Sequence, residues 1–238
     1  DTLCANGDPV PLSAGDRAKV EIEFDSIALA IAEYEAGPGE RSFSSKFDAS
    51  FKGQYKLKKQ ERRGLALFRG KAGCKACHPS NGQMAAFTGF TYDNLGVPPN
   101  PENPALVADP DFRDPGLGGF LWARGESEEV WMAELGKMKV PTLRNVGQKP
   151  TPESVKAYGH NGYFKSLKGI VHFYNTRDVK PECPNPLTTM EDAIAQDCWP
   201  APEIADNVNT SDIGDLGLTD EEEDAIVAFL EALTDDFF

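Results

Sequence analysis

Two cysteines and a histidine form the motif with the most definite chemistry in this chain. Cys74, Cys77 and His78 stand in a C-x-x-C-H spacing, which is the attachment pattern of a c-type haem. The two thiols can each form a thioether with one of the two vinyl groups of a porphyrin, and the adjoining imidazole then lies beneath the iron. The motif therefore predicts one covalently bound haem c with His78 as the proximal ligand.

A C-x-x-C pair also occurs in zinc sites and in redox dithiols, and neither alternative fits this sequence well. A zinc site requires a second pair of ligands at suitable spacing, whereas Cys4, Cys183 and Cys198 each stand alone. A redox dithiol of the thioredoxin kind opens a βαβ unit, and the sequence shows no such pattern. Haem attachment is the preferred interpretation.

The side of the haem opposite His78 decides whether the iron only transfers electrons or also binds small molecules. Tyr174 falls in the middle of the apolar face of a helix predicted over about 165–175, and His172 lies roughly 160–200° away from it. Tyr174 is therefore expected to point inward and His172 outward. At this point Tyr174 is either a distal ligand or a core aromatic whose hydroxyl is hydrogen-bonded.

Three further residues are candidates for the haem pocket. Met138, close before Pro141, can ligate iron through its thioether or fill a gap in the core. His160, in the turn Gly159-His160-Asn161-Gly162, can donate to a haem propionate, ligate the iron, act on a substrate or be an ordinary turn histidine. The guanidinium of Arg144 matches a propionate carboxylate in shape and charge, although taken alone it is one arginine among many.

Composition limits the class of partner and the compartment. The 238 residues carry 38 acidic and 24 basic side chains, for a net charge of -14. This charge disfavours nucleic acid and favours a basic redox protein, or simply keeps an exported protein soluble. No apolar run approaches the 18 residues of a membrane span. The chain begins at Asp1 without a signal-like stretch, as expected of a mature exported protein or a cut fragment.

Haem attachment itself takes place outside the cytoplasm, so a periplasmic or secreted location is expected. In such an oxidising compartment Cys183 and Cys198, which flank a Pro-rich loop, are expected to form a disulfide. Closing a loop of this length contributes about 3 kcal/mol in the chain-entropy model. Cys4 is then left free, or pairs with a partner chain or with residues outside this sequence.

The elements that must position these residues are helical. Apolar periodicity and capping signals predict four helices, and the last of them begins with a capping box between Thr219 and Glu222. Between them lie two long stretches rich in Pro, Gly, Asn and Asp, 88–141 and 179–210, which are expected to wrap the haem. The other predicted helices cover the apolar stripe of Ile27, Ala30, Ile31 and Tyr34, closed by Gly37-Pro38-Gly39, and about Lys58–Arg69 and Lys165–Asn175. The predicted fold is all-α, a c-type cytochrome fold with long irregular loops, with 1–17 as an N-terminal extension and 18–238 as a single domain.

Several stretches together resemble the bacterial dihaem cytochrome c peroxidases, including the MauG-type enzymes. They match the C-terminal haem lobe of that family in order and spacing, from roughly Phe24 to the end. The stretches are Gly64-Leu65-Ala66-Leu67-Phe68 before the C-x-x-C-H motif, Phe90-Thr91-Tyr92-Asp93-Asn94-Leu95-Gly96, Val140-Pro141-Thr142-Leu143-Arg144-Asn145-Val146, His160-Asn161-Gly162-Tyr163-Phe164-Lys165-Ser166-Leu167, Val171-His172-Phe173-Tyr174-Asn175 and Leu218-Thr219-Asp220-Glu221-Glu222-Glu223.

This resemblance changes the expectations for the distal side. In the family the distal ligand of this lobe is a Met or, in MauG-type enzymes, a Tyr on the helix after the His-Asn-Gly turn, and Tyr174 occupies that place. The resemblance thus implies ligation by His78 and Tyr174, with Met138 as the alternative. It also implies that Arg144 pairs with a propionate and that His160 belongs to the haem pocket.

Two departures from the family pattern limit what can be transferred. The chain has one C-x-x-C-H motif where the family has two haem lobes. The stretch from Gln148 to Tyr158 is longer than usual, so the interlobe calcium of the family is doubtful here. The leading functional hypothesis is a monohaem cytochrome that relays single electrons. The alternative is a haem peroxidase or oxidase, either because its distal ligand is displaceable or because a missing second lobe completes it. Incorporation into a larger complex is a further alternative.

Overall fold

The computed structural model describes residues 10–37, 42–82, 84–151 and 153–238. By its internal contacts the chain divides into two units, Asp1–Phe43 and Ser44–Phe238, and each is described by itself. The expected division into 1–17 and 18–238 stays a prediction about domains, since the contact boundary falls after Phe43. Cys4 lies outside the described residues.

The described part of the first unit contains one long helix, α2, from Ala14 to Glu35. Ser13 caps its start by accepting a hydrogen bond from the backbone amide of Asp16. The predicted apolar stripe is helical, but no residue of α2 is buried, and Ile27 is 60% exposed. The predicted terminator lies partly outside the described residues, because positions 38–41 are not described. Local hydrogen bonds rather than core burial therefore hold α2 within this unit.

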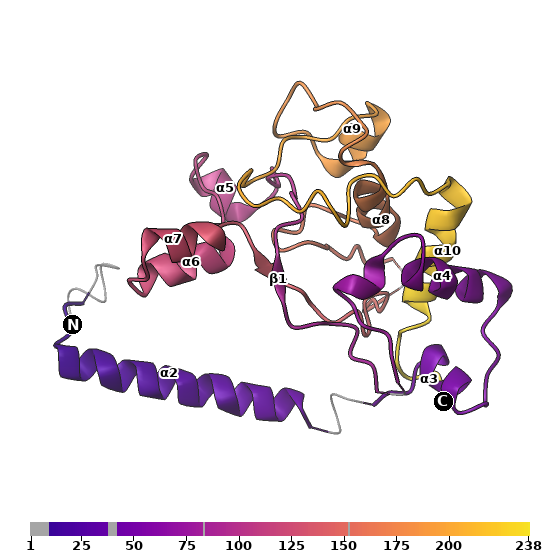
Figure 1. Ribbon diagram of the computed structural model, residues 1–238, viewed down its shortest axis with the longest axis horizontal. Helices are drawn as coiled ribbons and strands as arrows, with labels where there is room; N and C mark the ends of the chain where they lie inside the picture. The colour runs from indigo at the N-terminus through magenta and orange to yellow at the C-terminus, as the bar shows by residue number, and fades with distance from the viewer. Residues whose placement is uncertain (1–9, 38–41, 83, 152) are drawn as a thin grey trace. The chain divides into compact units, whose positions relative to one another are not determined.

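The second unit contains the remaining helices and confirms the all-α prediction (Figure 1). The helices predicted from periodicity and capping are α4, α8 and α10, and α4 and α8 end within one residue of their predicted ends. The capping box of α10 is present, with the Thr219 hydroxyl and the Glu222 carboxylate each accepting the other residue's backbone amide hydrogen. The bounds are α3 Lys46–Phe51, α4 Lys59–Arg69, α8 Leu167–Thr176 and α10 Asp220–Glu231.

The core forms where α4 crosses α10, and a glycine permits the close approach. A Cβ added at Gly64 of α4 would collide with the backbone carbonyl of Ala225 in α10 and lie 2.8 Å from Cβ of Phe229. Around this crossing Phe47, Phe68 and Phe229 are almost wholly buried and meet edge to face. The crossing holds fixed the helix that leads into the C-x-x-C-H motif.

The two stretches expected to be irregular contain short elements that the sequence did not reveal. The first holds α5 Pro104–Ala108, α6 Gly116–Ala123 and α7 Glu128–Ala133, with strands β1 Tyr92–Asp93 and β2 Met138–Lys139 paired antiparallel. The second holds α9, Met190–Ala195, which lies between the two cysteines of the disulfide. Cys183 and Cys198 are joined as expected, with their Cα atoms 5.1 Å apart. Among the described residues, no helix combines the length and apolar character needed to cross a bilayer.

Candidate haem site

The C-x-x-C-H motif forms a tight turn directly after α4. Gly73 adopts a positive φ of 67°, and a single 3-10 turn, Cys74–Ala76, follows it. The backbone amide of His78 then donates to the carbonyl of Cys74 over 2.9 Å. A glycine is favoured at the start because the left-handed conformation carries no Cβ penalty there. The turn gathers both thiols and the imidazole on one short segment.

The imidazole of His78 is fixed by a hydrogen bond to a backbone carbonyl. Its Nδ1 lies 2.7 Å from the carbonyl oxygen of Phe87. A carbonyl only accepts, so Nδ1 carries the proton and Nε2 of the neutral ring keeps its lone pair. Burial lowers the pKa of His78, and this outweighs the opposing influence of the backbone carbonyls of Phe87 and Pro141. This is the arrangement that metal-ligating histidines show, in which the second ring nitrogen orients the first.

The segment that supplies this carbonyl is held in an unusual conformation. Phe87 has a φ of 52°, although it is not a glycine, and a side chain in this region costs about 1–2 kcal/mol. Its ring is fully buried and contacts the rings of Phe47 and Phe68 edge to face. Packing of the ring therefore offsets the backbone strain and aims the carbonyl at His78.

The two thiols are poorly suited to dithiol redox chemistry. Burial raises the pKa of Cys74 to about 12. Burial, and then the charges of Asp93 and Asp212, also raise the pKa of Cys77. Reactive dithiols have a lowered pKa, because the thiolate is the nucleophile. The raised pKa values of the two thiols thus argue against a catalytic C-x-x-C pair and agree with cysteines that attach a haem.

Strand β1 brings a carboxylate to the motif. Oδ2 of Asp93 lies 4.0 Å from Sγ of Cys77 and accepts a hydrogen bond from the side-chain amide of Asn209 over 2.7 Å. Asp93 was not singled out as a site residue, although it stands inside one of the stretches that carry the family resemblance. Its position places a negative charge beside the site of haem attachment.

Tyr174 of α8 faces the two cysteines, as the helical periodicity predicts for an inward residue. Burial raises the pKa of the Tyr174 phenol, and the nearby groups of Cys74, Cys77 and Asp93 raise it further. Within the described part of the chain, no protein group hydrogen-bonds to its hydroxyl, so the interpretation as a core tyrosine with a bonded hydroxyl finds no partner. The ring packs against the core beside Phe173. A neutral phenol is therefore held on the side of the thiols; whether it ligates iron stays a proposal.

His172 does not point freely outward, which corrects the expectation from periodicity. Its Nδ1 lies 2.9 Å from Oε1 of Glu223, a buried residue of α10. The outward face of α8 is covered by α10, so this face carries a polar contact between helices rather than a solvated surface.

Met138 and His160 lie together at a small cavity. Met138 belongs to β2, and with His160, Glu203 and Asn94 it lines a space of about 10 Å³, roughly the size of one water. Nε2 of His160 lies 2.8 Å from Oε2 of Glu203, and the side chains are 18% and 5% exposed. Burial acts to raise the pKa of Glu203, but the bonds from His160 and from the Asp114 amide outweigh it and lower the pKa. His160 therefore binds a carboxylate of the protein through Nε2.

Arg144 is engaged by a carboxylate of the protein. Its two terminal nitrogens donate to Asp48 over 2.6 and 2.9 Å, and its Nε donates to the carbonyl of Ala85 over 2.9 Å. Burial acts to raise the pKa of Asp48, but the hydrogen bonds from Arg144 and Ser45 outweigh it, so the pKa is lowered. The guanidinium thus fastens α3 to the segment before the site, and its predicted pairing with a haem propionate stays a prediction.

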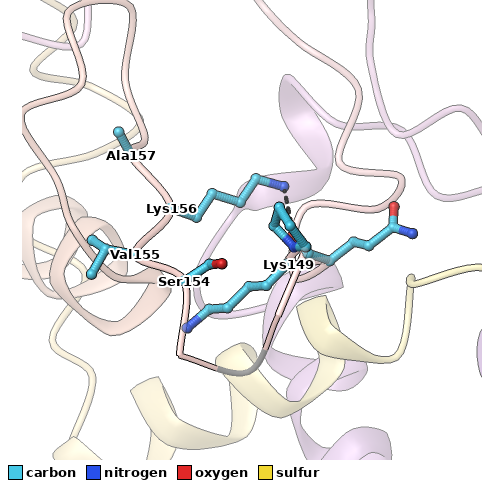
Figure 2. Close-up of a pocket in the computed structure, with 7 residues that line it drawn as sticks. Lys149, Ser154, Val155, Lys156 and Ala157 are labelled. Atoms are coloured by element: carbon cyan, nitrogen blue, oxygen red, sulfur yellow. Dashed lines mark hydrogen bonds between the residues drawn. The ribbon is translucent and has the colours of Figure 1, made fainter.

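The long stretch from Gln148 to Tyr158 surrounds a surface hollow of about 720 Å³ (Figure 2). Lys156 reaches back across it and donates to the backbone carbonyls of Asn145 and Gln148 over 3.0 and 3.2 Å. Lys149 also lines the hollow. Of the residues described here, those lining the hollow bring two ammonium groups and no carboxylate, a lining unsuited to a divalent cation. The doubt about calcium in this stretch stays a prediction.

The donor set fits a haem c. Two neutral thiols stand three residues apart on one turn, and the adjoining imidazole has a fixed Nδ1 and an available Nε2. Sequence reasoning missed Glu203 and Glu223, the carboxylates that bind His160 and His172. Both partners are about 40 to 50 residues away along the chain, so no local spacing pattern reports them.

Known proteins are similar to this chain over most of its length. No family model matches the sequence. The methylamine utilization protein MauG of Paracoccus denitrificans is 35% identical over 223 residues, which is 90% of this chain and 52% of that protein. Cytochrome-c peroxidase IdrP1 of Denitromonas iodatirespirans is 31% identical over 186 residues, 74% of this chain and 40% of that protein. The crystal structure of the diheme peroxidase BthA of Burkholderia thailandensis has a TM-score of 0.63 at 30% identity, covering 84% of this chain and 48% of BthA.

This chain belongs to the MauG and dihaem peroxidase family. It spans about half the length of the relatives that it matches. The resemblance and the cytochrome fold predicted from the motifs are thereby confirmed, and haem is the cofactor of the family. The names of the relatives are those of peroxidases and of MauG, so they favour the peroxidase alternative over the electron relay that the single motif suggested.

Proposed function

We propose that this chain is the redox lobe of a peroxide-using haem enzyme, matching the C-terminal lobe of its family, and that it holds one haem c through Cys74, Cys77 and His78. The observation that carries the proposal is the hydrogen bond from His78 Nδ1 to the Phe87 carbonyl, which leaves Nε2 available to iron. When bound, the haem supplies one-electron oxidation and reduction.

The proposal assigns the distal side to Tyr174. Its hydroxyl has no hydrogen-bonding partner among the described residues, and the phenol lies on the side of the thiols. A tyrosine ligand stabilises ferric iron and lowers the potential, which suits a centre that stores oxidising equivalents. Met138 is the alternative ligand, and it lies at the cavity of His160 and Glu203. Its Cε approaches Gly116 of α6 so closely that a Cβ added to this glycine would lie 3.1 Å from it.

The chain's own residues perform three tasks in this proposal. His78 is oriented by Phe87 and Tyr174 by α8, so both sides of the ring are defined by elements packed on the core. Asp93 places a negative charge beside Cys77, which favours the oxidised state of a nearby redox centre.

Peroxide reduction takes two electrons and two protons for each H₂O₂ converted to two waters, so a donor protein must deliver electrons. The acidic surface, with a net charge of -14, favours a basic donor.

The disulfide and the haem motif together support a periplasmic or secreted location for this enzyme.

The test is to produce the chain with periplasmic haem maturation and to compare it with Tyr174→Ala. Intact mass and the pyridine haemochrome spectrum should report one haem per chain, and Cys77→Ser should weaken covalent attachment. Ferric EPR should show a low-spin centre in the parent chain and a high-spin one in Tyr174→Ala. Opening the distal side should raise the rate of H₂O₂ consumption with a one-electron donor by tenfold or more.

Two results would contradict the proposal. A parent chain without bound haem would remove its basis, and a Tyr174→Ala variant with the parent EPR spectrum would remove Tyr174 from the iron. Tyr163→Ala is not a suitable control because that tyrosine is wholly buried, whereas Tyr92→Ala changes an exposed tyrosine of β1 and should leave the spectrum unchanged.

A further inference from the structure

Glu223 of α10 is a buried carboxylate with three donors from a single face of α8. Its side chain is 2% exposed. It accepts from Nδ1 of His172 over 2.9 Å and from Nδ2 of Asn175 over 2.7 Å, and Nζ of Lys168 lies 3.2 Å from its second oxygen. Positions 168, 172 and 175 are spaced i, i+4 and i+7, which places them on one face of a helix. The carboxylate therefore binds α8 along almost its whole length.

Asn175 closes this contact on the C-terminal side. Its amide nitrogen also donates to the carbonyl of Leu218, and its amide oxygen accepts the backbone hydrogen of Leu218 over 2.9 Å. Leu218 directly precedes the cap of α10, so Asn175 and Glu223 tie α8 to the first turn of the same helix. Rotation of α8 about its axis would break all of these bonds together.

The bonded face does not include Tyr174, which lies roughly 120° around the helix at 100° per residue. A phenol oxygen stands roughly 9 Å from the helix axis, so a rotation of about 10° moves it by about 1.5 Å. Functional groups must be held within about 0.5 Å of their productive position. The direction of Tyr174 thus depends on how firmly α8 is held against rotation.

We propose that Glu223 is a positioning residue for Tyr174: by binding Lys168, His172 and Asn175 it sets the rotation of α8 and aims the phenol at the haem iron. This inference rests on the proposed function, because it takes Tyr174 as the distal ligand. Glu223 itself touches neither the thiols nor His78 in these contacts; it acts through α8.

The experiment compares ferric EPR spectra and reduction potentials of haem-loaded variants of the full chain. Glu223→Leu keeps the approximate volume but removes every acceptor, and it should lose most of the low-spin signal of the parent. Glu223→Gln still offers an oxygen to His172 and Asn175 and should restore most of that signal. Glu221→Gln removes the same charge from the same turn, where the Glu221 carboxylate accepts from the hydroxyl of the cap residue Thr219, and should match the parent.

A role confined to stability would give a different result. Glu223→Leu would then unfold at lower urea concentration while its EPR spectrum and potential stayed those of the parent, and this outcome would overturn the proposal. If Glu223→Leu takes up no haem, His172→Phe removes one of the three donors and should broaden or divide the low-spin signal; an unchanged spectrum there would overturn the proposal equally.

Tyr174→Phe separates the two proposals. An unchanged spectrum in Tyr174→Phe refutes distal ligation and the positioning role with it. A changed spectrum in Tyr174→Phe combined with an unchanged one in Glu223→Leu refutes the positioning role alone.

Discussion

The ion pair of Arg144 and Asp48 is the feature whose removal should most affect stability. The Asp48 side chain is 2% exposed and that of Arg144 10%. The carboxylate accepts two bonds from the guanidinium, and a backbone and a hydroxyl bond from Ser45 over 3.0 and 2.5 Å. Asp48→Asn keeps the shape of the side chain but removes the negative charge that Asp48 places against the buried guanidinium.

The expected cost follows from this geometry. Removing one partner of a buried pair costs about 3–5 kcal/mol, because the remaining charge has lost its compensation. The amide oxygen introduced by Asp48→Asn would still accept one bond, so this variant should cost about 3 kcal/mol. Arg144→Met leaves the carboxylate with only Ser45, and a cost at the upper end of that range is expected. The double variant removes both charges and should be less destabilised than the sum of the two, with a coupling of about 3 kcal/mol.

The assay is urea unfolding of the haem-loaded chain, followed by far-UV circular dichroism at pH 7. Asp197→Asn provides a matched control, because Asp197 pairs with Lys180 at an 80% exposed position and should show no measurable change. A coupling below about 1 kcal/mol would refute the view that Arg144 serves to hold α3. In that case a propionate would be the better partner, and Arg144→Met should then shift the reduction potential while Asp48→Asn should not.

Three further predictions concern the same unit. Burial acts to raise the pKa of Asp48, but its hydrogen bonds lower it by more, so the pKa in the folded protein lies below that in the unfolded chain. The stability that the Asp48 carboxylate gives the fold is therefore complete above about pH 4 and is lost as pH falls through the folded pKa. Acid unfolding of Asp48→Asn should be less steep than that of the parent. Gly64→Ala forces a methyl group into the backbone of α10 and should cost at least about 3 kcal/mol in urea unfolding. Gly53→Ala meets no atom within 4 Å and carries only the strain of its positive φ of 69°, so it should cost about 1–2 kcal/mol. Replacing both Cys183 and Cys198 by serine should lower stability by about 3 kcal/mol, and an unchanged unfolding midpoint would contradict a structural role for the disulfide.

The parts of the fold that the sequence predicts are those with local causes. The cap of α10 and the apolar stripe of α8 depend on residues three to seven positions apart, and both helices are present. Helix α6 lies in the stretch 88–141, whose Pro, Gly, Asn and Asp content predicts irregular structure, and it contains Gly116, Gly118 and Gly119. The structure shows why they stand there: a Cβ at Gly118 would lie 2.6 Å from Cα of Leu135. These glycines permit close packing rather than interrupt a helix, and only the tertiary contact reveals this.

The same distinction explains the candidate site. His78 follows from its adjacency to Cys77. The inward direction of Tyr174 follows from the 100° periodicity of one helix, whereas its candidacy as a ligand comes from the family resemblance. What holds each of them is non-local: a carbonyl of an irregular segment for His78, and for Tyr174 the carboxylate of Glu223 on another helix. The residues that would meet the haem are thus local in sequence, whereas their orientation is set by contacts that only folding creates. Variants of Phe87 and Glu223 should accordingly change the spectrum of the iron more than substitutions elsewhere in the segment of Phe87 or in α10, without removing a ligand.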